Sequence, residues 1–150
     1  MNRAPLILIG LLLLATSQVI AETPLRFTSV DVFIDSAEPM AAWQLEFSAS
    51  GVGMQVVGVE NGDSQAFHNA PYYDREAVEQ GRADRIIVAD YSLENGPQLP
   101  QGRTRVTTLH LMLLGDNAPA FNTRLIVATS SQGTRIDAEI SIEVSDGSEQ

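Results

Sequence analysis

The chain has no cysteine and no lysine, and it contains a single tryptophan. Without cysteine no disulfide can form, so a folded domain must be stabilised by packing and backbone pairing alone. All nine basic residues are arginines, and they face 19 acidic residues, which gives a formal net charge of −10. Such a surface repels the phosphates of nucleic acids and of anionic lipids, so we expect neither nucleic acid nor membrane as a partner.

The one long apolar run lies at the N-terminus. Arg3 precedes the apolar residues 6–15, and small or apolar residues stand at positions −3 and −1 of a cut before Glu22. This arrangement is typical of a secretory signal peptide, and the run is much shorter than the roughly 20 residues of a membrane-spanning helix. We therefore expect residues 1–21 to be removed. Residues 22–150 should form one domain, secreted to the periplasm or the extracellular space.

Alternation of apolar and polar residues dominates the rest of the chain. Trp43, Leu45 and Phe47 share one face of a predicted strand, while the glutamine and glutamate between them share the other. Alternation of this kind places one face on a core and the other in water, as in antiparallel sheets. The expected strands cover residues 30–35, 43–47, 54–60, 85–91, 104–114, 124–130 and 135–144.

Turn-forming segments rich in glycine, asparagine, serine and proline separate these strands. Seven short strands with such turns predict an all-β fold, an antiparallel two-sheet jelly-roll β-sandwich. One short helix is expected near residues 74–81, because Asp74 is a good N-cap and Gly81 can close the C-terminal end. Two helical turns are marginal in water, so this helix must pack against the sandwich.

The stretch "HNAPYYDREAVEQGR", residues 68–82, contains the candidate ligand-binding residues Tyr72, Tyr73 and Asp74. Adjacent side chains on an extended chain point to opposite sides, so only one tyrosine can join a flat platform. We expect one ring to pack under the helix and the other to be partly exposed with its hydroxyl bonded. Asp74 is expected to cap the helix rather than act as an acid. The stretch is thus predicted to be a structural connection, with ligand contact at its rim as the alternative.

A polysaccharide-binding surface needs several coplanar exposed rings, because each ring stacks on one sugar face. Trp43 shares its face with the apolar side chains of Leu45 and Phe47, and aligned apolar faces are normally buried. We therefore expect Trp43 to lie in the core, which weakens the interpretation of the chain as a sugar-binding platform.

Metal binding has little support in the sequence. His68 and His110 are far apart, and with no cysteine the ligands of a zinc site are missing. Calcium binding is possible, but no motif supports it. Calcium needs six or more converging oxygens, and single loop carboxylates do not supply them. The loop carboxylates that could contribute are Asp63, Asp74, Asp84 and Asp116. We expect no metal site and no cofactor.

Catalytic motifs are also missing. Ser64 precedes His68 by four residues in a predicted loop, but it lacks the Gly-x-Ser-x-Gly setting of a nucleophile elbow. A glycosidase would need two carboxylates facing each other across a cleft, which the sequence does not indicate. We therefore assign no catalytic residue, and an enzyme is the least favoured of the functions considered.

Five segments taken in order resemble cohesin-like domains, a group of jelly-roll sandwiches that includes bacterial cellulose-binding modules. They are "VDVFIDSAEPMAAWQLEF", "VVGVENG", "PYYD", "RIIVADYS" and "LPQGRTRVTTLHL", and the resemblance spans about residues 28–144. It implies a non-catalytic module that binds a dockerin or has drifted to other extracellular binding. The chain itself has no Asp-x-Asp-x-Asp-Gly loop of the dockerin type, and we expect no linker or enzyme module to accompany the domain.

From these features we expect a free-standing secreted binding or scaffolding module. Its partner should be a secreted or surface protein, contacted through a sheet face. A carbohydrate-binding module for extracellular polysaccharide is the alternative, and an enzyme is the second alternative.

Overall fold

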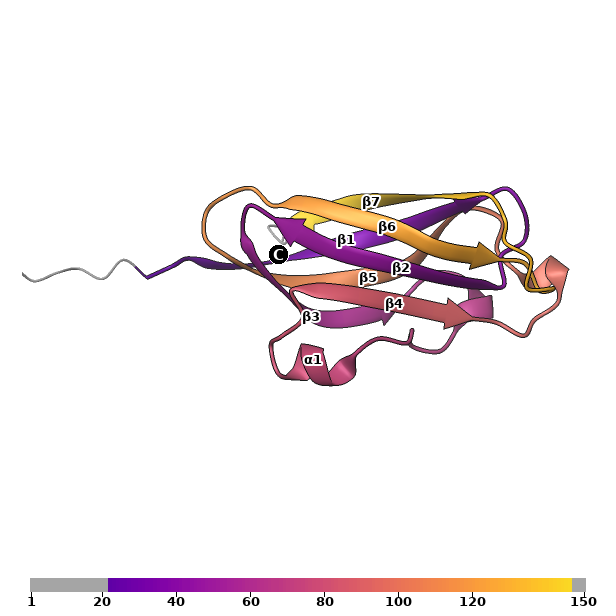
Figure 1. Ribbon diagram of the computed structural model, residues 1–150, viewed down its shortest axis with the longest axis horizontal. Helices are drawn as coiled ribbons and strands as arrows, with labels where there is room; N and C mark the ends of the chain where they lie inside the picture. Colours follow the sequence, from indigo (N-terminus) through magenta and orange to yellow (C-terminus); the bar gives the residue numbers. More distant parts are fainter. Residues whose placement is uncertain (1–21, 147–150) are drawn as a thin grey trace, which may run out of the picture.

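The computed structural model describes residues 22–146, and the expected signal peptide, residues 1–21, lies outside the described residues. The described chain forms seven strands, one short α-helix and two 3₁₀ turns (Figure 1). The strands are β1 (Leu25–Ser36), β2 (Ala42–Ser50), β3 (Gly53–Asn61), β4 (Arg85–Tyr91), β5 (Gly102–Leu114), β6 (Ala120–Thr129) and β7 (Ala138–Asp146). The helical segments are α1 (Arg75–Glu79), η1 (Gln65–Phe67) and η2 (Gly96–Gln98).

The strands form two sheets with the orders β3-β5-β1-β7 and β4-β2-β6, and all their pairings are antiparallel. Figure 1 shows the three-stranded sheet lying across the four-stranded one, with α1 at the side where β3 and β4 lie. The predicted all-β, antiparallel two-sheet sandwich with one short helix is thereby confirmed. No helix within residues 22–146 combines the length and hydropathy needed to cross a bilayer.

The core lies between the sheets and is filled by the apolar rows predicted from alternation. Trp43, Leu45 and Phe47 of β2 are at most 1% exposed, and they face rows of valine, isoleucine and leucine from β1 and β5. Each such side chain removed from water contributes about 1.5–3 kcal/mol, so these rows are the main source of stability in a chain without disulfides. The expectation that Trp43 is a core residue is confirmed.

The C-terminal apolar row is divided between the two sheets. Alternation predicted one strand over residues 135–144, but β7 begins only at Ala138. Before that point Arg135 pairs with Thr129, and the Ile136 amide donates to the carbonyl of Ala128, so the chain first lies along β6. It then crosses to the four-stranded sheet. Apolar and polar residues keep alternating where the chain crosses between the sheets, so the sequence pattern does not reveal the crossing.

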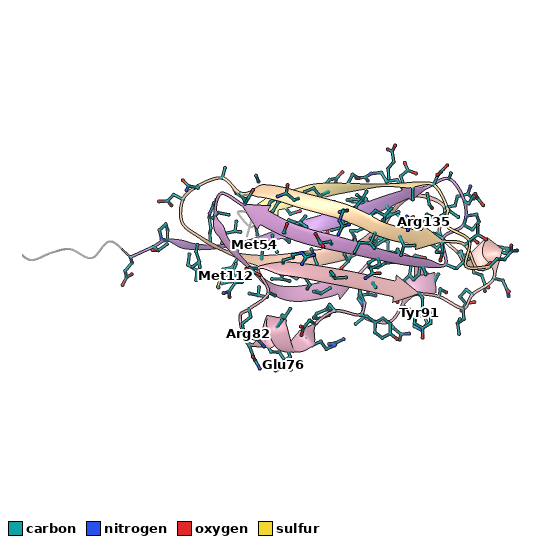
Figure 2. The ribbon with its side chains drawn as sticks, viewed as in Figure 1. Met54, Glu76, Arg82, Tyr91, Met112 and Arg135 are labelled. Carbon is teal, nitrogen blue, oxygen red and sulfur yellow. The ribbon has the colours of Figure 1, made fainter. Side chains whose placement is uncertain are left out.

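The helix α1 follows the predicted capping scheme. The Asp74 carboxylate accepts a hydrogen bond from the backbone amide of Ala77, 2.9 Å away, and so acts as the N-cap. Gly81 adopts φ +63°, a left-handed conformation that suits glycine, and it ends the helix. The exposed side chains of Glu76 and Arg82, labelled in Figure 2, form a loose ion pair at 3.9 Å.

Candidate functional site

The segment before α1 is attached to the edge of β4 through Tyr72. The Tyr72 amide donates to the Ala89 carbonyl at 2.7 Å, and the Ala89 amide donates back to the Tyr72 carbonyl at 3.0 Å. This antiparallel bridge satisfies part of an otherwise open sheet edge. It also fixes which way the neighbouring side chains point, because side chains alternate along an extended chain.

The two adjacent tyrosines therefore have different environments. Tyr72 lies on the outer side of the sheet and is 60% exposed. Tyr73 is half-buried against the core, and the guanidinium of Arg75 lies 4.9 Å from the centre of its ring. The structure thus has one packed ring and one exposed ring, as expected from the sequence. Asp74 is exposed, but its carboxylate is engaged as the helix cap, so among the three candidate residues Tyr72 is the one that presents an exposed aromatic ring.

A second exposed tyrosine, which the sequence reasoning missed, lies beside Tyr72. Tyr91 ends β4 two residues after Ala89, so its side chain emerges on the same face as that of Tyr72. The two rings stack with their centres 5.9 Å apart and their planes 13° from parallel. The side chain of Tyr91, as a polar neighbour, raises the pKa of Tyr72 above its ordinary value. Figure 2 shows Tyr91 at the end of β4, away from α1.

Leu93 extends this apolar surface beyond the end of the strand. It is 92% exposed, and Tyr91 is 54% exposed. We call Tyr72, Tyr91 and Leu93 the tyrosine surface. Exposed apolar clusters of this kind mark interaction sites more often than isolated exposed side chains do.

An open groove of about 380 Å³ runs from the tyrosine surface across the outer face of the three-stranded sheet, and we call it the outer groove. Gln44 of β2 lies at its centre, because this residue pairs with Ala89 on one side and with Val127 on the other. The lining is mostly apolar and consists of Ala42, Trp43, Gln44, Tyr72, Ala89, Asp90, Tyr91 and Val127.

A smaller hollow of about 230 Å³ lies on the other side of the two tyrosines, and we call it the end cavity. Tyr72, Asp90 and Tyr91 line both hollows. The end cavity is more polar than the outer groove, because loop residues supply much of its wall. These additional residues are Ala66, His68, Asn69, Ser92, Leu93 and Glu94.

Asp90 is a buried carboxyl between these hollows. It is 5% exposed; its Oδ1 accepts the Tyr91 amide at 2.8 Å, whereas its Oδ2 is buried with no hydrogen-bond partner. Burial raises the pKa of Asp90, and the bond from the Tyr91 amide and the nearby His68 only partly oppose this rise. A charged carboxylate in such a place is costly unless a donor or a cation approaches it.

The opposite end of the same sheet face is occupied by an ion-pair cluster. Glu46 of β2 accepts hydrogen bonds from Arg85 and from Arg124, the latter at 3.2 Å. The bond from Arg85 is the largest cause of a lowered Glu46 pKa. Because these charges satisfy one another, this end of the sheet offers less to a ligand than the end with Asp90.

The lining of the end cavity includes an aspartate, a histidine and a serine, the residue types of a catalytic triad, but these residues bond to other groups. His68 donates from Nδ1 to the Gln65 carbonyl at 3.2 Å, and the Ser92 hydroxyl accepts the Glu94 amide at 3.1 Å. Within residues 22–146, no hydrogen bond joins Asp90, His68 and Ser92 to one another, although a triad requires that relay.

Ser64, the other serine weighed beside His68, accepts the Ala66 amide at 3.2 Å and caps η1. It therefore has a structural role.

Two of the other candidate metal ligands, Asp63 and His110, are engaged elsewhere. Asp63 forms an ion pair with Arg105, and His110 contacts Glu60 at 2.9 Å on the four-stranded sheet. In the part of the chain that the structure describes, no three histidine or acidic side chains are grouped so that they could hold a metal ion.

Comparison with known proteins gives no match to a family model, to a curated protein or to a solved structure. The resemblance to cohesin-like domains therefore stays a prediction from the five quoted segments.

Proposed function

We propose that this protein is a secreted, non-catalytic binding module that holds a protein partner on the outer face of the β4-β2-β6 sheet. The observation that carries this proposal is the exposure of the tyrosine surface, 60% for Tyr72, 54% for Tyr91 and 92% for Leu93. Covering apolar surface contributes about 25 cal/mol per Å², so a partner that buries these side chains gains affinity. Ile87, 42% exposed on the same face of β4, extends the contact.

The geometry of the two tyrosines suits an interface. Large aromatic side chains with a polar tip are enriched among the residues that contribute most to protein binding. The stacking of the Tyr72 and Tyr91 rings restrains both side chains before any partner arrives. Less conformational entropy is then lost on binding, which favours affinity.

A protein partner fits better than a polysaccharide. Sugar rings stack on open aromatic faces, but Tyr72 and Tyr91 stack on each other and so cover part of each other's faces. Trp43 is 1% exposed and is not available for stacking. Leu93 adds apolar area that gives no hydrogen bonds to sugar hydroxyls.

Carbohydrate binding is the second candidate, and one observation favours it. The ring of Tyr91 adjoins Asn69, Ser92 and Glu94 in the end cavity, and these polar side chains can bond to hydroxyl groups. The expected signal peptide supports an extracellular setting for either ligand. The resemblance to cohesin-like domains supports both, with protein binding first.

The test compares two variants of the purified protein immobilised as bait. The double variant Tyr91→Ala/Leu93→Ala removes most of the tyrosine surface. Phe27→Ala is the matched control, because it removes an aromatic ring that is 61% exposed on the four-stranded sheet. Each bait is presented with secreted and surface proteins of the source cells, and retained proteins are quantified by mass spectrometry.

We expect the wild-type protein and the Phe27→Ala variant to retain the same partner, and the double variant to lose it. Equal retention by all three baits would contradict the assignment of the contact to this face. Affinity electrophoresis in polysaccharide gels tests the second candidate. Retardation that is lost on Tyr91→Ala would favour the carbohydrate function instead.

A further inference from the structure

The lining of the end cavity contains more acidic than basic side chains. Asp90 and Glu94 are the acidic residues of its lining, and His68 is the basic residue among those that line it. The chain as a whole has a net charge of −10, so its field adds to the local attraction for a cation. Charge complementarity therefore indicates a basic group as the occupant of this cavity.

Asp90, a buried residue of the cavity lining, strengthens the attraction for a cation. Its Oδ2 has no partner, and Trp43, the residue opposite on β2, has an indole Nε1 that is also buried without one. The carboxylate thus lies in a medium of low polarity, where its potential is screened less than at the surface. A cation held in the cavity would offset part of the cost of burying this charge.

The aromatic wall selects among cations. An arginine guanidinium is planar, stacks on aromatic faces and pairs with carboxylates through several donors, whereas a lysine ammonium is a compact, strongly hydrated charge. The chain itself uses this contact twice. The guanidinium of Arg75 lies 4.9 Å from the centre of the Tyr73 ring, and that of Arg103 lies 3.6 Å from the centre of the Phe33 ring.

The size of the end cavity suits a single side chain. Its volume of about 230 Å³ is below the roughly 300–1,000 Å³ of typical small-molecule pockets. The neighbouring outer groove and Leu93 offer apolar contact for the chain that carries this side chain.

We propose that the partner is anchored by an arginine whose guanidinium lies in the end cavity, against the Tyr91 ring and the Glu94 carboxylate, above buried Asp90. This inference rests on the proposed function, because it names the chemistry of the partner at the same surface. It identifies the residue type that the partner must present.

The direct test uses small probes and the full-length processed protein. N-acetyl-arginine methylamide is titrated into ¹⁵N-labelled protein, and the amide of Tyr91 and the indole N–H of Trp43 are followed by NMR. The matched probes are the citrulline analogue, which has the same shape without charge, and the lysine analogue. We expect saturable shifts with arginine at roughly millimolar concentration. Citrulline should bind at least about tenfold more weakly and lysine several-fold more weakly.

Two variants test the two carboxylates separately. Asp90→Asn keeps the shape of the buried side chain, and Glu94→Gln changes an exposed one that does not affect the core. Each is expected to weaken binding of the arginine probe by roughly fivefold. Asp116→Asn is the control, because it makes the same charge change in the loop between β5 and β6, at the far end of the sandwich (Figure 1).

The outcomes separate this inference from the proposed function. Equal binding of arginine and citrulline, binding of lysine as tight as arginine, or no effect of either carboxylate variant would overturn the arginine anchor. If partner capture then still depends on Tyr91 and Leu93, the proposed function stands without it. If arginine binds as predicted but capture ignores the tyrosine surface, the proposed function fails.

Discussion

Trp43 and Asp90 lie opposite each other on β2 and β4, both facing inward, and each has a buried polar atom without a hydrogen-bond partner. The indole Nε1 is an unused donor and the carboxylate Oδ2 an unused acceptor, yet their geometry does not form a bond. Proteins leave few buried polar atoms unpaired, because each costs about 1–3 kcal/mol. The fold therefore carries a destabilising group directly beneath the tyrosine surface, as functional sites often do.

The first prediction concerns the pH dependence of stability that this carboxyl causes. The pKa of Asp90 is raised in the folded protein, so between its unfolded and folded pKa values the folded state binds more protons than the unfolded state. Any stabilisation from protonated Asp90 is thus fully present below the unfolded pKa and is lost as pH rises through the folded pKa.

Asp90→Asn removes this titration and is expected to raise the free energy of unfolding at pH 7 by about 1 kcal/mol relative to wild type. The difference in free energy of unfolding between the variant and wild type should shrink as the pH is lowered towards 4. Urea denaturation of both proteins between pH 4 and 7 measures this difference. A difference that stays constant over this range would contradict the assignment of a raised pKa.

The second prediction tests the core. Trp43→Ala removes the largest fully buried side chain, and truncations of this kind cost about 3–5 kcal/mol. Phe27→Ala, at a position 61% exposed, should change stability by less than about 0.5 kcal/mol. Because Trp43 is the only tryptophan, unfolding should be followed by far-UV circular dichroism rather than by fluorescence. Similar losses in both variants would contradict the described packing.

The third prediction concerns the start of α1. Asp74→Ala removes the carboxylate that accepts the Ala77 amide, and loss of such a cap typically costs about 1 kcal/mol. Asp74→Asn should retain most of the stability, because asparagine is an equally good N-cap. Neither change should alter partner capture, since the Asp74 carboxylate is engaged in the cap and lines neither the outer groove nor the end cavity. Loss of capture in both variants, with stability unchanged, would assign Asp74 to the binding site instead.

The fourth prediction concerns the Glu46 cluster. Hydrogen bonding to Arg85, and to a lesser extent Arg124, lowers the pKa of Glu46 in the folded state. Its contribution to stability is present above the unfolded pKa and is lost as the pH falls through the folded pKa. Glu46→Gln should therefore have a lower free energy of unfolding than wild type near neutral pH, and this difference should become smaller in acid. High salt should also reduce the difference, because it screens the charges.

The strands and the core could be predicted from the sequence because alternation is a local signal. The apolar rows of β2 and β5 appear in the sequence as every second residue, and they are buried in the structure. The capping of α1 by Asp74 was predictable for the same reason, since its partner Ala77 is three residues away.

The tyrosine surface could not be predicted because it depends on pairing between segments distant in sequence. Tyr72 meets Tyr91 only because the Tyr72–Ala89 bridge sets the register between the two segments. One signal was available: in "RIIVADY" both faces of the strand are largely apolar, although an edge strand with one face in water should be polar on that face. Ile87 and Tyr91 are the exposed half of that pattern.

The measurement that tests the central claim most directly is the affinity of the retained protein for matched variants of this chain. The partner is purified, and its dissociation constant is measured by calorimetry against the wild type, Tyr91→Ala/Leu93→Ala and Phe27→Ala. Removing central aromatic and aliphatic contacts should weaken binding at least about tenfold in the double variant, with Phe27→Ala unchanged. Equal affinity for all three proteins would show that the partner binds elsewhere and would contradict the account.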